Sequence, residues 1–285
     1  PDGEVAAHTP AFVVKEPQQR YNRIGSPAIQ PSADGRAVAV VDPELPTLFF
    51  ETTPFTTPRG EYRNLVYRLH FPEVPFSWRS PNLTTGKNPG LLIIYTLDAK
   101  DRLLLVTTVH TCGCFLAFLP TPLLDRAAYP ANWPGGGDQA VYGYRLPTLV
   151  ESPNEDGQRL VFTIESQTHR IGAVHCDDPG DLSGKEVAMH LAPMRSLHFL
   201  PYDGGEISFF ETSGPRNGYV RNNTKILERL LISWWAFDWR VGEDKAFGGD
   251  DASPAIFYTS LKFWARKASD MKDFPTFLDY WGWGL

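Results

Sequence analysis

The stretch "GLLIIYTLDAKDRLLLVTTVHTCGCFLAFL", residues 90–119, decides how the chain is expected to fold. Two long apolar arms flank a polar segment that runs from Asp98 to Asp101. A short polar segment between two apolar runs is typical of a tight turn between antiparallel strands. We therefore predict a β-hairpin here, whose second arm carries one histidine and two of the three cysteines in the chain.

Similar short apolar runs recur on both sides of this hairpin. Between about residues 37 and 212, runs of four to nine residues alternate with turn segments rich in Pro, Gly, Asp and Asn, which is the pattern of many short strands. We expect strands, apart from the hairpin, at residues 37–42, 47–55, 64–71, 159–166, 171–176, 186–193 and 206–212. The pattern predicts an antiparallel, β-rich body over residues 37–212.

The pattern changes to a helical one after residue 223. Asn223 can cap a helix over residues 224–240, and a second helix is expected over residues 253–270. The face of the first helix that we expect in the core consists of Ile226, Leu227, Leu230, Leu231, Trp234 and Phe237. Because strands precede helices, we predict an α+β fold with a C-terminal helical layer over about residues 223–283. Residues 1–36 are expected to be an extended segment before a single domain, residues 37–285.

The most distinctive chemistry lies at the end of the hairpin. In an extended strand His110, Cys112 and Cys114 would share one face, because side chains alternate between faces. Positions two apart are then roughly 6.6 Å from each other, so a straight strand cannot bring all three to one ion. Gly113 permits a bulge or a tight bend that would bring the two thiols together. We therefore predict that Gly113 departs from ordinary strand geometry.

Three interpretations of the cysteines stay open. They are buried core residues, ligands of a metal ion, or a local disulfide or redox pair. Further ligands are expected from His175 and Cys176, which precede the acidic turn at residues 177–178. A metal site requires one of these two within about 8 Å of Cys112 or Cys114. Thiolates and imidazoles favour Zn or Cu, and the full predicted ligand set is His110, Cys112, Cys114, His175 and Cys176.

Other motifs give weaker indications. The acidic residues Glu243, Asp244, Asp250 and Asp251 lack the spacing of an EF-hand, so we interpret them as a solvated loop between helices. The chain contains no nucleophile elbow, no phosphate-binding loop, no dinucleotide fingerprint and no zinc-protease motif. A carboxylate pair of a glycoside hydrolase leaves no local motif. Enzymatic activity is therefore undecided from sequence.

Composition narrows the choice of partners and compartment. The net charge is −6 without a long run of one sign, which argues against nucleic acid as a partner. No segment approaches the roughly 20 apolar residues of a membrane-spanning helix, so a soluble protein is expected. The opening at Pro1 reads as a processed end. We expect an exported, periplasmic or extracellular protein of a bacterial envelope, with the cytoplasm left open as an alternative.

Trp235 and Trp239 extend the apolar surface of the first predicted helix to a second side. That side is expected to be covered by the next helix and the aromatic tail, or else to contact a membrane surface or a hydrophobic ligand. The leading hypothesis is a protein that binds Zn or Cu through its cysteines and histidines. The alternatives are a non-catalytic envelope or interaction protein with core cysteines, and a hydrolase that acts on carbohydrate.

Overall fold

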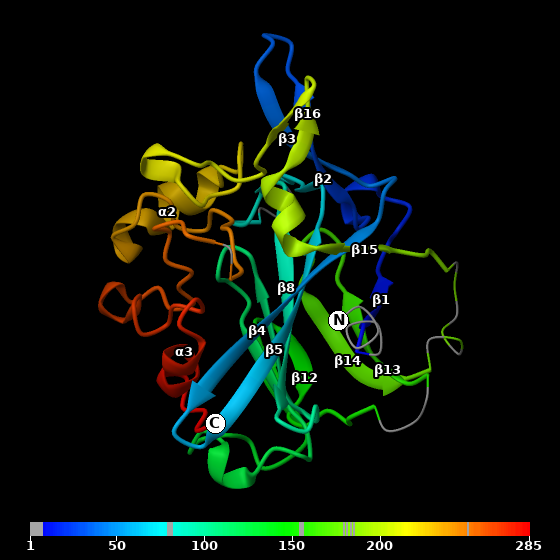
Figure 1. The fold of residues 1–285 in the computed structure, drawn as a ribbon, viewed down its shortest axis with the longest axis vertical. Coiled ribbons are helices and arrows are strands. Elements are labelled where there is room, and N and C mark those ends of the chain that lie inside the picture. Colours follow the sequence, from blue (N-terminus) through cyan, green and yellow to red (C-terminus); the bar gives the residue numbers. More distant parts are fainter. Residues whose placement is uncertain are drawn as a thin grey trace.

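The fold is built around one large sheet that runs through the centre of the molecule. The computed structural model describes residues 8–78, 82–153, 157–178, 180, 182, 184, 186–249 and 251–285. Figure 1 shows the helices α2 (Ile226–Ala236) and α3 (Phe274–Tyr280) on one side of this sheet, and the strands β13 (Arg159–Ile164) and β14 (Ile171–Asp177) on the other. The described part of the chain is thus β-rich, with its α-helices in the last quarter.

The central sheet has the strand order β10-β9-β8-β5-β4-β15. Neighbouring strands are antiparallel, except that the edge strand β15 runs parallel to β4. The strands, in sequence order, are β4 (Thr47–Thr57), β5 (Gly60–His70), β8 (Gly90–Asp98), β9 (Leu103–His110), β10 (Ala117–Pro120) and β15 (His190–Pro193). The predicted hairpin is confirmed as β8 and β9, where Leu91 pairs with His110.

Both faces of the hairpin strands are buried, which explains why their sequence is apolar without alternation. Leu92 and Ile94 belong to a core cluster that also contains residues of α3 and the C-terminal tail. Leu91 and Ile93 point the opposite way, into a second cluster that contains residues of β13 and β14. The central sheet is therefore the partition between two hydrophobic cores.

Several elements come from segments for which no strand was predicted. β1 (Ala11–Val14) pairs in parallel with β13, and β2 (Ser26–Pro31) pairs with β3 (Ala37–Asp42). These pairings bring two parts of the predicted N-terminal segment into the sheets. The smaller two-stranded sheets consist of β6 (Glu73–Val74) with β7 (Gly86–Lys87), β11 (Asp138–Val141) with β12 (Tyr144–Pro147), and β16 (Leu200–Tyr202) with β17 (Gly205–Ile207).

The predicted second helix, over residues 253–270, is wrong. The segment forms a short 3-10 turn at Phe263–Ala265, while Tyr258 forms an antiparallel bridge with Asp270. The Asp270 carboxylate accepts the Phe257 backbone N–H at 2.9 Å, and the Thr259 N–H donates to the Ser269 carbonyl at 3.1 Å. Side-chain acceptors that compete for backbone donors in this way override helical periodicity.

Candidate functional site

The two neighbouring cysteines lie in a tight turn at the end of β9. The His110 N–H donates to the Cys114 carbonyl at 2.9 Å, and the Gly113 N–H donates to the His110 carbonyl at 2.8 Å. Gly113 has φ = 92°, in the left-handed region, so its predicted departure from strand geometry is confirmed. A Cβ atom at Gly113 would lie 2.1 Å from the Tyr258 carbonyl oxygen, so only glycine fits this turn.

The turn brings the two thiols together. They share a hydrogen bond, and the Cys114 backbone N–H also donates to Cys112 Sγ at 3.4 Å. Both are free cysteines; Cys112 is buried and Cys114 is partly buried. Burial acts to raise the pKa of Cys112, but the hydrogen bond from Cys114 and the charge of Lys225 lower it overall. The hydrogen bond to Cys112, together with burial, raises the pKa of Cys114 well above its ordinary value.

A buried ion pair lies beside the thiol turn. Lys225 Nζ is 2.9 Å from Asp244 Oδ2, and neither side chain is more than 1% exposed. Asp244 also accepts hydrogen bonds from the Thr111 hydroxyl and from Asn223 Nδ2, the latter at 2.6 Å. Burial alone would raise the pKa of Asp244, but Lys225 and these donors hold it below its ordinary value. The carboxylate therefore stays ionised within the protein interior.

A second buried lysine supports the turn from below. Lys245 Nζ donates to the Cys112 carbonyl at 3.1 Å and to the Glu243 carbonyl at 3.0 Å. It also lies 4.9 Å from the centre of the Tyr258 ring. Its charge is thus met by carbonyl oxygens and an aromatic ring. Burial lowers the pKa of Lys245, although the nearby cysteines act in the opposite direction.

The prediction that residues 243–251 form a solvated loop is wrong for its first part. Glu243 and Asp244 are buried, because Arg229 pairs with the former at 2.7 Å and Lys225 with the latter. Asp251 forms an ion pair with Lys272. Asp250 lies outside the described residues. Sequence reasoning identified these acids but missed the burial of Glu243 and Asp244, because their basic partners lie in other segments of the chain.

The remaining predicted ligands have other environments. His110 is buried, and its Nε2 lies 3.1 Å from the His169 carbonyl; burial lowers the pKa of His110 to about 4. His175 and Cys176 lie on β14, where they pair with Val161 and Leu160 of β13. Among the described residues, no three or more His, Cys, Asp or Glu side chains form a group that could hold a metal ion. The five-residue ligand set remains a prediction.

Helix α2 covers this polar cluster with an unexpected face. It buries Glu228, Ser233 and Ala236, and burial raises the pKa of Glu228. The predicted core face of this helix is therefore wrong, because most of it is open to solvent. The exposed fractions are 62% for Ile226, 65% for Leu230, 56% for Leu231, 69% for Trp234 and 73% for Phe237. The helix turns its polar side inward because the charged cluster of Lys225 and Asp244 lies beneath it.

The apolar side of α2 continues into the following segments. We call the whole exposed set the aromatic surface; it consists of Ile226, Leu230, Leu231, Trp234, Trp235, Phe237, Trp239, Leu261, Phe263 and Trp264. Phe237 and Phe263 are in edge contact, with ring centroids 5.1 Å apart, and Arg266 donates a hydrogen bond to the Ala236 carbonyl. In Figure 1, α2 lies at the side of the molecule, away from the β13–β14 sheet. Segments 226–239 and 261–264 therefore form one continuous surface.

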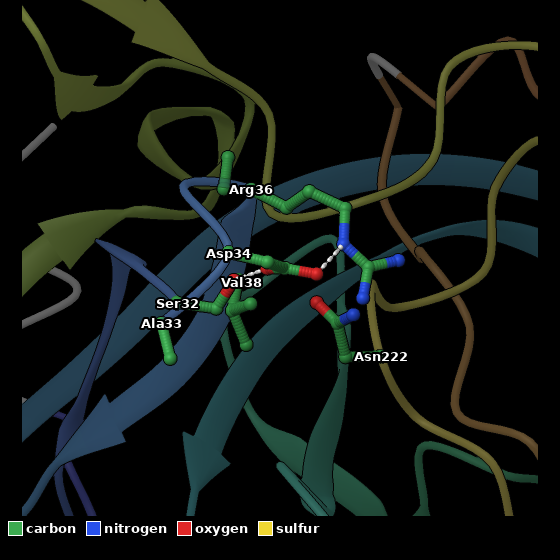
Figure 2. Close-up of a pocket in the computed structure, with 7 residues that line it drawn as sticks. Ser32, Ala33, Asp34, Arg36, Val38 and Asn222 are labelled. Carbon is green, nitrogen blue, oxygen red and sulfur yellow. Dashed lines mark hydrogen bonds and ion pairs between the residues drawn. The ribbon is translucent and has the colours of Figure 1, made fainter.

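A pocket at the β2–β3 turn offers less chemistry. Figure 2 shows Asp34 aimed at Arg36, whose Nε lies 2.7 Å from the carboxylate, while Ser32 donates to the same carboxylate. The Asn222 side-chain oxygen accepts the Ala39 backbone N–H at 3.1 Å. These exposed polar groups satisfy one another or the backbone, so the thiol turn and the aromatic surface are the stronger candidates.

The described part of the chain contains no helix with the length and apolar character needed to span a bilayer. No family model, no curated protein and no solved structure matches the chain.

Proposed function

We propose that this protein works at a membrane surface, to which it docks through the aromatic surface. The observation that carries the proposal is the orientation of α2, which buries Glu228 and Ser233 while Trp234 and Trp235 face solvent. A helix that only completes a core buries its apolar side. Helices that lie in a lipid interface instead present Trp and Leu side chains to the bilayer.

The charges around the aromatic surface fit an anionic bilayer. Within the described residues 224–249 and 251–268, the exposed charged residues are Lys262 and Lys267, while the acidic residues are buried or partly buried. A lysine near an anionic leaflet contributes about 1 kcal/mol of attraction. Tryptophan favours the headgroup level because its ring is apolar and its N–H is polar. The surface therefore combines apolar anchors with positive charge.

The two segments that were expected to cover the aromatic surface, the second helix and the C-terminal tail, do not cover it. In the C-terminal tail, Trp283 packs against Phe118 and Tyr129, with ring centroids 5.4 Å away in each case. Residues 261–264, from the expected second helix, extend the aromatic surface instead of covering it. Because neither of these two segments covers the aromatic surface, a lipid bilayer is the better partner for it.

Vesicle sedimentation tests the proposal. The full chain should co-sediment with vesicles that contain anionic lipid, and the triple variant Leu230→Ser, Trp235→Ser, Trp264→Ser should lose most of this binding. Trp78→Ser is the matched control, because Trp78 is 89% exposed but lies outside the aromatic surface. Absence of vesicle binding at low salt, or equal binding by the triple variant, would contradict the proposal.

The thiol turn supports a second candidate function, the binding of Zn or Cu. The observation in its favour is the contact between the thiols of Cys112 and Cys114, since thiolates are strong ligands for both metals. Elemental analysis of protein purified without added metal is the test. About one ion per chain, absent from a Cys112→Ser, Cys114→Ser variant, is expected; an unchanged metal content would remove the candidate.

A further inference from the structure

We infer that Cys112 and Cys114 together bind a single monovalent soft metal ion, Cu(I), between their two sulfur atoms. The inference rests on the metal-binding candidate above, which it deepens by selecting the ion, and it is independent of membrane docking. It is carried by the number of ligands, by the buried charge around the turn and by the rigidity of the turn.

The number of ligands separates copper from zinc. Structural Zn(II) takes four ligands in tetrahedral geometry, and catalytic Zn(II) takes three from the protein. The described residues contain no group of three or more candidate ligands, whereas the turn at Gly113 brings the two cysteines together, with the Cys114 backbone N–H donating to Cys112 Sγ at 3.4 Å. Cu(I) is selected by soft thiolates and forms stable complexes with only two of them. The pair is therefore complete for Cu(I) and incomplete for Zn(II).

The buried charges favour the same ion. Two thiolates with Cu(I) carry one negative charge, while two thiolates with Zn(II) are neutral. The charge of Lys225 is met by Asp244 at 2.9 Å, whereas Lys245 Nζ donates to the carbonyls of Cys112 and Glu243. Glu228 also faces the cluster from α2. The cysteines, Asp238 and Asp244 all favour the charged form of Lys245. A negative centre at the sulfurs would add to this compensation of the buried Lys245 cation, whereas a neutral zinc centre would not.

The turn is held in place without the ion. Its backbone is closed by the hydrogen bonds between His110 and both Gly113 and Cys114, and the Tyr258 carbonyl lies against Gly113. The Thr111 carbonyl accepts the Lys245 backbone N–H at 2.9 Å. A site whose ligands are positioned by such supporting contacts binds its metal with little reorganisation.

The surroundings also suit a copper ion that must avoid oxidation. Cys112 is 2% exposed, and the charges of Lys225, at the N-cap of α2, and of Glu228, within α2, act on it. The more open approach is on the Cys114 side, where the exposed Tyr142 stands close to both thiols and contacts the Phe115 ring at 5.2 Å between centroids. A small ion can enter there, while the bulk of solvent is kept from the inner sulfur.

Competition for Cu(I) with the chelator bicinchoninate, under anaerobic and reducing conditions, tests the inference on the full chain. One Cu(I) per chain should be retained, and Cys112→Ser and Cys114→Ser should each abolish retention. Cys176→Ser is the matched control and should retain the ion, because Cys176 lies on β14. Zn(II) offered with a chelator of comparable strength should not be held.

A second measurement does not depend on whether the variants fold. With the unmodified chain, bound Cu(I) should protect Cys112 and Cys114 from alkylation, as read by mass spectrometry, while Cys176 stays reactive. Zn(II) held as tightly as Cu(I) would overturn the choice of ion but leave metal binding intact. Loss of copper retention in Cys176→Ser, or alkylation of Cys112 and Cys114 despite copper, would overturn the two-sulfur site. Vesicle binding should be unaffected in every arm.

Discussion

Gly113 shows how one residue can shape a site. Its φ of 92° is unfavourable for any residue with a side chain, and the Tyr258 carbonyl occupies the place where a Cβ would stand. The sequence indicated this role, because a glycine between two cysteines is the simplest way to bend a strand. The sequence could not indicate the Tyr258 contact, because the two residues lie far apart along the chain.

We expect Gly113→Ala to lower the free energy of unfolding by about 2 kcal/mol or more, because left-handed backbone strain and a backbone clash act together. Urea denaturation measures this change. Gly35→Ala is the matched control, since Gly35 has φ = 77° with open space around it. Gly35→Ala introduces the left-handed backbone strain without a backbone clash, so it should lower the free energy of unfolding by less than Gly113→Ala does. Equal losses in the two variants would show that the Tyr258 contact is unimportant.

Removal of either partner from the buried Lys225–Asp244 ion pair is expected to destabilise the protein. Lys225→Met should lower the free energy of unfolding by about 3–5 kcal/mol, because it leaves the Asp244 carboxylate buried without a counter-charge. The double variant Lys225→Met, Asp244→Asn should recover part of this loss, as followed by thermal and urea unfolding. A double variant less stable than Lys225→Met alone would contradict the interpretation.

At the scale of elements, α2 shows the limit of periodicity. The apolar spacing predicted a helix, and a helix is present over residues 226–236. Spacing alone could not tell which side faces the protein, because that depends on what lies beneath. Lys225 and Glu228 face the charges of Asp244 and Lys245, which lie in a later segment that no local window of sequence includes.

This orientation makes a prediction opposite to the usual one for apolar helix residues. Leu231→Ser should change the free energy of unfolding by no more than about 0.5 kcal/mol, because the side chain is already in water. Ala236→Leu, on the buried side, should cost about 1–3 kcal/mol through overpacking. Chemical denaturation of both variants gives the comparison. A larger loss for Leu231→Ser would mean that α2 is turned the other way.

The central hairpin was predictable for the opposite reason. β8 and β9 are joined by a turn of a few residues, and their pairing depends only on neighbouring sequence. β1 and β15 were harder to place, because each runs parallel to a strand that lies more than a hundred residues away in sequence. Local patterns therefore specify the hairpin, whereas the sheet edges depend on the complete fold.

At the scale of the whole molecule, buried histidines make the free energy of unfolding depend on pH. His169 stacks on Phe71, with ring centroids 4.0 Å apart, and its Nε2 lies 2.9 Å from the Tyr21 carbonyl. Burial, reinforced by the charges of His110 and Lys225, lowers the pKa of His169 to about 3. The unfolded chain binds the proton at about pH 6.5, well before the folded one does.

The stabilising contribution of His169 is therefore complete above pH 6.5 and is lost as the pH falls from about 6.5 towards 3. One such group contributes a slope of at most about 1.4 kcal/mol per pH unit. His70 and His110 act in the same direction, because burial lowers their pKa values as well. Urea unfolding at pH 7, 5 and 4 measures how steeply the free energy of unfolding falls with pH. This slope should be smaller for His169→Gln than for the unmodified chain. Identical slopes would contradict the prediction.

The aromatic surface also has a consequence for the protein in the absence of lipid. Apolar side chains that favour a bilayer favour contact with other copies of the chain for the same reason, so self-association and vesicle binding draw on one pool of monomer. The apparent affinity for vesicles should then fall as the protein concentration rises, and light scattering should detect oligomers that disperse on addition of mild detergent. In water, self-association and membrane binding thus compete for the same aromatic surface.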